Sequence, residues 1–265
     1  MTGERFRGRR VLVTGASRGI GAATATRLAA EGADVAIVAR TVSAHDHLPG
    51  SLAETAARLA RFGGRVAAVP ADLSDETARA TVVPRAVEAL GGPIDVLVNN
   101  AAAAIHAPLR GFPLRRRRVT FEVNVHAPLD LAQAVAGPMV ERGEGWIVNV
   151  SSASARLAAD PTMSVYGASK AALNRITQGL ALELAGTGVR VNTIEPRAAV
   201  MSEGAAALVG ATLREDQVEP METMVEAVVA LADCPADLTG RTCVSLDLVA
   251  ELGLTVRALD GGPLR

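Results

Sequence analysis

The first strand, turn and helix of the chain are encoded in Val11-Leu12-Val13-Thr14-Gly15-Ala16-Ser17-Arg18-Gly19-Ile20-Gly21. The β-branched run predicts a buried strand, and the alanine-rich helical pattern that follows continues to Ala30, before Gly32. The glycines between them have the spacing G-x-x-x-G-x-G. They permit a tight turn and let a pyrophosphate approach the free N–H groups of the helix. Glycine turns also serve purely structural purposes, so this stretch alone does not decide the function.

The same strand–helix alternation repeats along the rest of the chain. We expect further strands at 35–38, 66–69, 95–98, 145–150, 189–194 and 243–246, and helices at 52–62, 77–90, 118–140, 166–185 and 221–232. Fully apolar strands that alternate with helices indicate a parallel sheet covered on both faces. The prediction is an α/β, doubly wound Rossmann fold with a seven-stranded, mostly parallel sheet. Without an internal repeat or a linker, residues 1–265 are expected to form one domain.

Composition narrows the possible partners and location. The 27 basic and 28 acidic residues nearly balance, so neither nucleic acid nor a membrane is expected as partner. The N-terminus lacks the apolar stretch of a secretory signal, and no apolar run is long enough to span a membrane. Cys234 and Cys243 have no neighbours at metal-ligand spacing, which predicts no metal site and two inert thiols in a cytoplasmic protein.

Four consecutive arginines, Arg115 to Arg118, are the most unusual feature of the composition. They come at the entrance to the expected helix 118–140. A solvated helix face or a subunit contact is the favoured interpretation, and binding of a phosphate or a substrate anion is the alternative.

The end of the second strand bears on the choice between nicotinamide cofactors. A site selective for NAD places an Asp or Glu there, to accept hydrogen bonds from the ribose 2′-hydroxyl. The residues are instead Ala39, Arg40 and Thr41. Arg40 and Arg18 can pair with a 2′-phosphate, which favours NADP(H) and leaves NAD(H) as the alternative.

Tyr166 and Lys170 stand four residues apart, one turn along the same helix face. A phenol with a pKa of about 10 exchanges protons poorly at neutral pH. The lysine cation and an oxidised nicotinamide are expected to lower that pKa. The strand before this helix ends in Ser151-Ser152, at the edge of the sheet where ligands bind. A serine there can meet Tyr166 over a substrate carbonyl.

These motifs together resemble the short-chain dehydrogenase/reductase family along nearly the whole chain. The matching residues are Thr14-Gly-x-x-x-Gly-Ile-Gly21, Asp72, Asn99-Asn100-Ala101-Ala102, Asn124, Ser152, Tyr166-x-x-x-Lys170 and Val191-Asn-x-Ile-x-Pro196. The resemblance implies a catalytic set of Asn124, Ser152, Tyr166 and Lys170. Asn124 would support a proton-relay water, Ser152 would polarise the carbonyl, Tyr166 would exchange the proton, and Lys170 would bind the nicotinamide ribose.

The resemblance also implies the residues that bind the cofactor. Asp72 would hold the adenine amino group, and Asn99 would line the adenosine site. The whole expected set is Gly15, Ser17, Arg18, Gly19, Ile20, Gly21, Arg40, Thr41, Asp72, Leu73, Asn99, Ala101, Tyr166, Lys170 and Pro196.

The chain departs from the family pattern at several positions. Ala102 and Arg197 replace the usual glycines, and Met201 replaces a common threonine. The interval between Ser152 and Tyr166 is one residue longer than usual, so Ser151 or Ser154 could supply the hydroxyl instead. The long loop 40–52 is similar to a subgroup that contains hydroxysteroid-dehydrogenase-like and citronellol-dehydrogenase-like proteins. Its histidines, His45 and His47, are interpreted as ordinary loop residues.

The expected activity is reversible carbonyl/alcohol oxidoreduction by hydride transfer. The substrate pocket would be formed by residues 156–165 and 198–209, the second of which belongs to a substrate-binding loop region at 197–225. Their Ala, Leu, Met and Val content favours an apolar or amphipathic substrate. The alternative is a redox-sensing protein that binds the dinucleotide without turnover. Small residues on the helix 166–185, among them Gly167, Ala168, Ala171 and Ala172, favour a homodimer or homotetramer.

Overall fold

A seven-stranded parallel sheet organises the chain in the computed structural model, which describes residues 4–43, 49–157, 160–203 and 217–264. The strands lie in the order β3-β2-β1-β4-β5-β6-β9, and every pair is parallel. Their bounds are β1 Arg10–Thr14, β2 Asp34–Ala39, β3 Val66–Pro70, β4 Val96–Asn99, β5 Gly145–Val150, β6 Val189–Glu195 and β9 Thr242–Val244. The predicted doubly wound α/β fold is confirmed.

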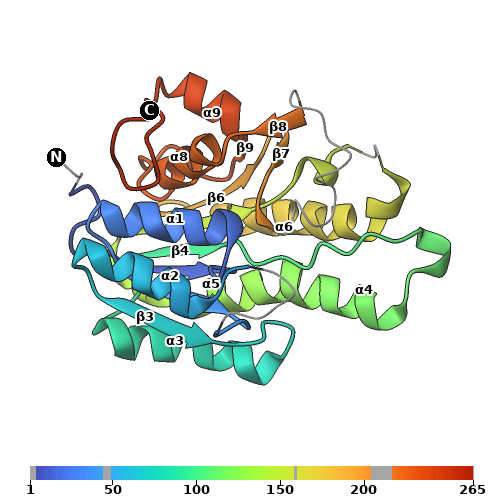
Figure 1. Cartoon of the computed structure of the whole chain (residues 1–265), viewed down its shortest axis with the longest axis horizontal. Helices are drawn as coiled ribbons and strands as arrows, with labels where there is room; N and C mark the ends of the chain where they lie inside the picture. The colour runs from blue at the N-terminus through green and yellow to red at the C-terminus, as the bar shows by residue number, and fades with distance from the viewer. Residues whose placement is uncertain (1–3, 44–48, 158–159, 204–216, 265) are drawn as a thin grey trace.

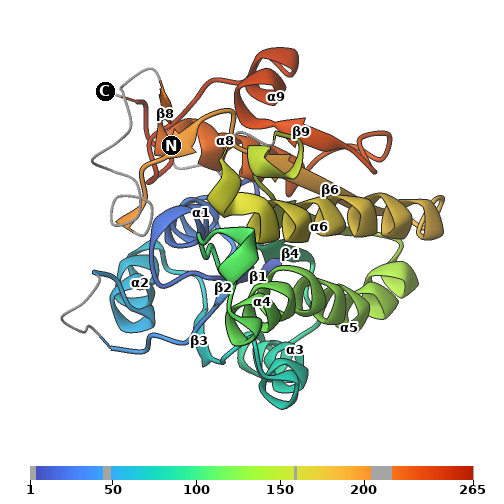
Figure 2. The ribbon, with the colours of Figure 1, turned by 90° about the vertical axis from the view of Figure 1, so that its right-hand side faces the viewer.

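Helices cover both faces of this sheet (Figures 1 and 2). Alternate residues of each strand point to opposite faces, so Val11 and Val13 belong to one apolar cluster and Leu12 to the other. The first cluster packs under α1, α2 and α8, and the second under α3, α5 and α6. Their bounds are α1 Gly19–Ala30, α2 Leu52–Leu59, α3 Glu76–Leu90, α5 Ala127–Arg142, α6 Ser164–Glu183 and α8 Met221–Leu231.

The expected helix 118–140 has a different construction. It begins earlier, as α4 at Leu114–Phe121, passes through a π-helical turn at Glu122–His126, and continues as α5. The arginine run therefore forms the first turns of α4. Pro128 is the second residue of α5 and follows directly after the π-helical turn.

Two further differences concern the C-terminal part. The last strand is β9, and the residues expected to extend it instead begin the helix α9 at Ser245–Glu251. A separate two-stranded sheet, β7 at Ala199–Val200 and β8 at Val218–Glu219, was not predicted. Strands of two residues carry too little periodicity to be recognised in a sequence.

A buried ion triad joins α1 to α8. Arg27 Nε lies 2.6 Å from the Glu31 carboxylate, and its Nη1 lies 2.9 Å from that of Glu226. All three side chains are 6% exposed or less. The backbone N–H of Arg257 also donates to Glu226, at 3.2 Å. The triad thereby fixes the C-terminal segment against the first helix of the fold.

We expect both cysteines to resist alkylation in the folded protein. Cys234 and Cys243 are free and buried, and burial raises the pKa of each thiol, that of Cys234 to about 11. The reactive thiolate is therefore scarce at pH 8. Mass spectrometry after iodoacetamide treatment should find no adduct in native protein and two adducts in urea. Rapid labelling of the native protein would contradict the burial of these thiols.

Neither a membrane span nor a metal centre is found in the described part of the chain. Every helix there is too short or too polar to cross a membrane. No three His, Cys, Asp or Glu side chains gather there in a way that could hold a metal ion.

Candidate active site

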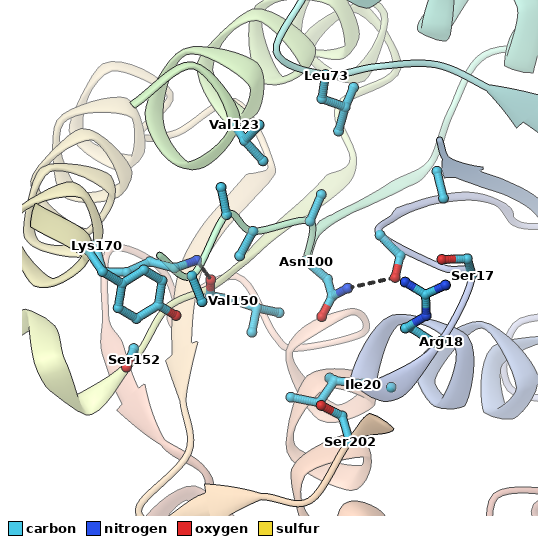
Figure 3. A pocket seen from close by; sticks show the side chains of 18 of the residues that line it. Ser17, Arg18, Ile20, Leu73, Asn100, Val123, Val150, Ser152, Lys170 and Ser202 are labelled. Atoms are coloured by element: carbon cyan, nitrogen blue, oxygen red, sulfur yellow. Dashed lines mark hydrogen bonds between the residues drawn. The ribbon is translucent and has the colours of Figure 1, made fainter. Parts of the chain in front are cut away.

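A cavity of about 570 Å³ opens at the carboxyl ends of the central strands (Figure 3). Parallel strands place their carboxyl ends, and the N-termini of the following helices, along this one edge of the sheet. Most residues of the predicted site line the cavity. They are Gly15, Ser17, Arg18, Gly19, Ile20, Arg40, Thr41, Asp72, Leu73, Ala101, Ser152, Tyr166, Lys170 and Pro196.

The glycine turn between β1 and α1 is closely packed against Asn100. A Cβ atom on Gly21 would lie 2.4 Å from Asn100 Nδ2 and 2.5 Å from the Gly15 carbonyl oxygen. Gly15 has a left-handed φ of +66°. Thr14 supports the same contact, since its hydroxyl accepts hydrogen bonds from the N–H groups of Asn100 and Ala101. The turn is thus compact, with only glycine tolerated at these positions.

An acidic side chain already shows that the start of α1 favours an anion. The N–H of Gly19 donates to the Glu203 carboxylate at 2.9 Å. The helix dipole and the unpaired N–H groups of a first turn attract negative charge. Glu203 therefore acts as a stand-in for a phosphate, and the cradle fits the pyrophosphate of a dinucleotide.

Removing this competing charge should tighten cofactor binding. We expect Glu203→Gln to lower the Kd for NADP about 2- to 5-fold, because a carboxylate at a helix N-terminus contributes roughly 0.3–1 kcal/mol. Calorimetry would measure the change. Glu88→Gln, near the far end of α3, removes an exposed charge away from the cradle and should leave the Kd unchanged. Weaker binding in Glu203→Gln would show that Glu203 helps to hold the cofactor.

The two arginines expected to meet a 2′-phosphate differ in their surroundings. Arg40, at the end of β2, has a side chain that is 72% exposed and lies 4.0 Å from the Asp72 carboxylate. Arg18 donates to the carbonyl oxygens of Pro49 and Gly50, each at 2.8 Å, and so also fastens the loop after β2. Neither carbonyl partner could be inferred from the sequence.

Asp72 is held in its charged form. Partial burial raises its pKa, but hydrogen bonds from Ser74 and the charge of Arg40 outweigh that effect and keep the pKa below its usual value. An ionised carboxylate at this position can accept a hydrogen bond from an amino group.

Tyr166, Lys170 and Ser152 meet at the opposite end of the cavity from Ser17 and Arg18, as Figure 3 shows for the labelled members. Lys170 Nζ donates to the carbonyl oxygen of Val150 at 2.7 Å and lies 5.9 Å from the centre of the Tyr166 ring. Among the candidate serines, Ser152 is the one whose side chain lowers the pKa of Tyr166. Ser154 stands behind it and donates to the Ser152 hydroxyl at 3.0 Å.

The pKa of Tyr166 moves in the direction opposite to the one expected. Burial raises it, and the hydrogen bond with Ser152 opposes that rise only in part. Burial also lowers the pKa of Lys170 to about 8. Removing both groups from water disfavours both charged forms, and the ammonium is directed at Val150 rather than at the phenolic oxygen. The phenol is therefore protonated at neutral pH.

Three of the predicted residues lie behind the cavity wall. Gly21 belongs to the packed turn. Asn99 is buried and donates to Asn149 Oδ1 at 2.9 Å across the strand pair, whereas its neighbour Asn100 lines the cavity. Asn124, in the π-helical turn, accepts from the Ala103 N–H at 2.7 Å and donates to Ser169 Oγ at 3.0 Å. Its carboxamide thus ties the segment after β4 to the helix that carries Tyr166 and Lys170.

The other residues that line the cavity are mostly apolar, and few of them were predicted from the sequence. Besides Asn100, Ser151 and Ser202, it consists of Ala39, Ala71, Ala102, Ala103, Ala104, His106, Val119, Val123, Val150, Met163, Ala199 and Val200. Part of the segment 198–209, which was expected to form a wall, lies outside the described residues. Val119 and Val123 come from α4 and the π-helical turn, which no sequence pattern places beside the cavity.

Arg197 does not reach this cavity. Its guanidinium pairs with Asp247 of α9, and its backbone N–H donates to Glu219 at 2.9 Å. Among the described residues no non-glycine residue has a left-handed φ, so neither Arg197 nor Ala102 strains the backbone. Both replacements are accommodated without distortion.

Comparison with known proteins assigns the chain to a family. The family model described as short chain dehydrogenase matches residues 9–212, so the chain belongs to that family. A ketoacyl reductase from Nostoc is 36% identical over 71% of this chain and 63% of its own length. A short chain dehydrogenase from Burkholderia cenocepacia in complex with NADP has a TM-score of 0.76 and 35% identity, covering 91% of this chain and 97% of that one.

The subgroup resemblance also has a counterpart among the relatives. Hydroxysteroid dehydrogenase-like protein 2 of Xenopus tropicalis is 29% identical over 92% of this chain and 58% of its own length. The chain thus spans about three fifths of the length of these curated relatives. His45 and His47, in the loop on which the resemblance was based, lie outside the described residues.

Proposed function

We propose that the protein reduces a carbonyl, or oxidises the corresponding alcohol, with NADP(H) as the hydride carrier. The observation that supports this most directly is the meeting of Tyr166, Ser152 and buried Lys170 at one end of a cavity whose other end is the anion-favouring turn of α1. Bound there, the nicotinamide supplies or accepts a hydride at the substrate carbon. The two ends are thus complementary parts of one reaction site.

Each polar residue has a separate task in the reduction. Ser152 donates a hydrogen bond to the carbonyl oxygen and stabilises the negative charge that develops there. Tyr166 transfers its phenolic proton to the same oxygen, which completes the alcohol. Burial keeps that phenol protonated at neutral pH, the form that reduction requires. Lys170 is placed to bind ribose hydroxyls and to stabilise the phenolate left after the transfer.

The preference for NADP(H) is supported by the cavity end nearest β2. Arg40 projects there, and no carboxylate replaces it at the end of the strand. A guanidinium pairs well with a 2′-phosphate, whereas the ribose hydroxyl of NAD(H) would lack its usual acceptor. The Burkholderia relative with bound NADP is consistent with this choice.

The substrate part of the cavity favours an apolar or amphipathic molecule. Ala103, Ala104, Val119, Val123 and Met163 offer it few polar partners. A sugar phosphate would leave most of its hydroxyl groups unpaired against these side chains, which is costly. A ketone or aldehyde with a hydrocarbon body fits better.

Absorbance at 340 nm during incubation with a panel of ketones and aldehydes tests the proposal. Turnover of apolar carbonyl compounds with NADPH, and much slower turnover with NADH, is the expected result. Arg40→Ala should reduce the preference for NADPH without abolishing the reaction. Tight NADP binding in calorimetry, combined with no turnover in either direction, would instead identify the redox-sensing protein.

We also propose a homo-oligomer built on α6. Gly167 is not available for a contact, since it packs against Ser154 of the same chain. Ala168 and Ala171 remain exposed, and Leu182 on the same helix is 76% exposed. Small residues and an exposed leucine on one long helix suit a close helix–helix contact. Sedimentation at micromolar concentration should show a dimer or tetramer, and a monomer would overturn this proposal.

A further inference from the structure

Five arginines stand together at the start of the helical stretch that forms one wall of the cavity. Arg110 lies in the short helical turn Leu109–Gly111, and Arg115 to Arg118 form the first turns of α4. We call residues 110–118 the arginine segment. All five side chains are exposed, and no hydrogen bond or ion pair joins their guanidinium groups to a residue that the structure describes. The segment reaches the edge of the molecule in Figure 1.

The positive charge of this segment is not compensated nearby. The chain as a whole has a net charge of −1, so the residues outside the segment together carry −6. The acidic residues that follow along the helices, Glu122 and Asp130, are both bound by Arg79 at 2.7 and 2.8 Å. A concentrated and uncompensated charge of this kind creates a local field that attracts anions.

The same helical stretch forms a wall of the cavity. Val119 and Val123 line it, and Arg115 and Arg116 precede Val119 by four and three residues. Residues at these spacings share a helix face, about one turn or 5.4 Å apart along the axis. A molecule bound against Val119 and Val123 can therefore continue outward along α4 and meet these two arginines.

Neither the cofactor nor a second copy of this segment suits this position. The cradle at α1 and the side chain of Arg40 mark the phosphate sites of a dinucleotide, at the other end of the cavity. A two-fold symmetric contact centred on the segment would bring it against its own copy, and like charges would repel.

We propose that the natural substrate carries its carbonyl on an apolar arm attached to a phosphate-bearing handle, and that the arginine segment binds the phosphates. Guanidinium groups pair with phosphate through two parallel hydrogen bonds. The apolar lining accepts the arm, and Ser152 and Tyr166 receive the carbonyl at its inner end. This inference rests on the proposed carbonyl reductase function and adds the class of substrate.

Two thioesters that share the 3-oxobutanoyl group, and so the reacting carbonyl, but differ in the handle measure the contribution of the handle alone. One is the coenzyme A thioester, with a phosphorylated nucleotide, and the other is the N-acetylcysteamine thioester, which has no phosphate. With NADPH as reductant, we expect kcat/KM to be at least about 10-fold higher for the coenzyme A thioester. The difference should appear in KM, because the handle binds away from the reacting atoms.

Charge reversal of two arginines in α4 tests whether the preference for the coenzyme A thioester depends on the arginine segment. Arg115→Glu/Arg116→Glu should reduce the ratio of the two kcat/KM values at least about 10-fold. Arg61→Glu/Arg85→Glu, which reverses two exposed arginines just after α2 and on α3, should leave the ratio unchanged. Thermal unfolding would confirm that both double variants are folded. Equal kcat/KM values for the two thioesters in the wild-type protein, or an equal loss for both in the α4 variant, would overturn the proposal.

Binding of coenzyme A itself provides a readout that does not depend on turnover. Calorimetry in saturating NADP, which occupies the dinucleotide site, should show binding that weakens with added salt and is lost in Arg115→Glu/Arg116→Glu. Such binding without turnover of either thioester would support the arginine segment and contradict the reductase function. Absence of coenzyme A binding would overturn the inference, and binding of polyglutamate in its place would point to an acidic protein partner.

Discussion

Tyr166→Phe should lower kcat for carbonyl reduction about 10²- to 10⁴-fold, the range that a positioned proton donor contributes. The substitution removes one oxygen atom from the only tyrosine of the chain and keeps the ring. The ring still faces His106, whose centroid is 6.5 Å away, and the ammonium of Lys170. What is lost is the hydroxyl that donates the proton in the proposed reaction and whose pKa responds to Ser152.

Measuring the affinity for NADP distinguishes this loss of catalysis from a loss of structure. The cradle of α1 and the end of β2 lie at the other end of the cavity, so the Kd of Tyr166→Phe for NADP should stay within about 2-fold of the wild-type value. Steady-state kinetics and calorimetry on the same preparation would measure both quantities. Turnover unchanged in this variant would falsify the assigned role of Tyr166.

Arg27→Met should destabilise the folded protein by about 3–5 kcal/mol, the usual cost of removing one partner from a buried ion pair. Methionine fills much of the space of the arginine stem but leaves Glu31 and Glu226 without their cation. Both carboxylates are nearly inaccessible to solvent, with 6% and 5% of their side chains exposed. Only the N–H of Arg257 still donates to Glu226. Urea unfolding followed by circular dichroism gives the change in free energy.

A matched surface pair provides the control. Arg241 contacts Glu251 through two hydrogen bonds of 2.7 Å, but both side chains are almost half exposed. Water screens such a pair, so Arg241→Met should cost less than about 1 kcal/mol. Neutralising the carboxylates in Arg27→Met/Glu31→Gln/Glu226→Gln should restore part of the lost stability. An equal loss in the two single variants would show that burial of the triad does not govern its strength.

The sequence was sufficient for the fold because local patterns and global architecture agree. Apolar strands of three to seven residues, separated by helices that mostly end near a glycine, leave few arrangements other than a doubly wound parallel sheet. The same patterns place Thr14, Ser151 and Pro196 at or just beyond the carboxyl ends of their strands. The candidate site follows from this edge of the sheet and from the helical spacing of Tyr166 and Lys170.

What could not be predicted depends on contacts between distant segments. Asn99 and Asn100 are equivalent in a list of motifs, and only the pairing of β4 with β5 assigns Asn99 to Asn149 and Asn100 to the cavity. Arg18 contacts Pro49 and Gly50, which lie 31 and 32 residues further along the chain, and no local sequence pattern predicts such a contact. The π-helical turn is a change of backbone register, for which the side chains of Glu122–His126 give no periodic signal.

The packing of the glycine turn has a consequence for how this family evolves. The atoms that exclude a side chain at Gly21 belong to Asn100 and Gly15, so the glycine is required by the protein itself. Natural selection for folding would preserve it in a descendant that no longer catalyses anything, whereas Tyr166 would be free to drift. In a genome survey, glycine spacing therefore marks shared ancestry and architecture, and the tyrosine–lysine pair is the better marker of retained catalysis.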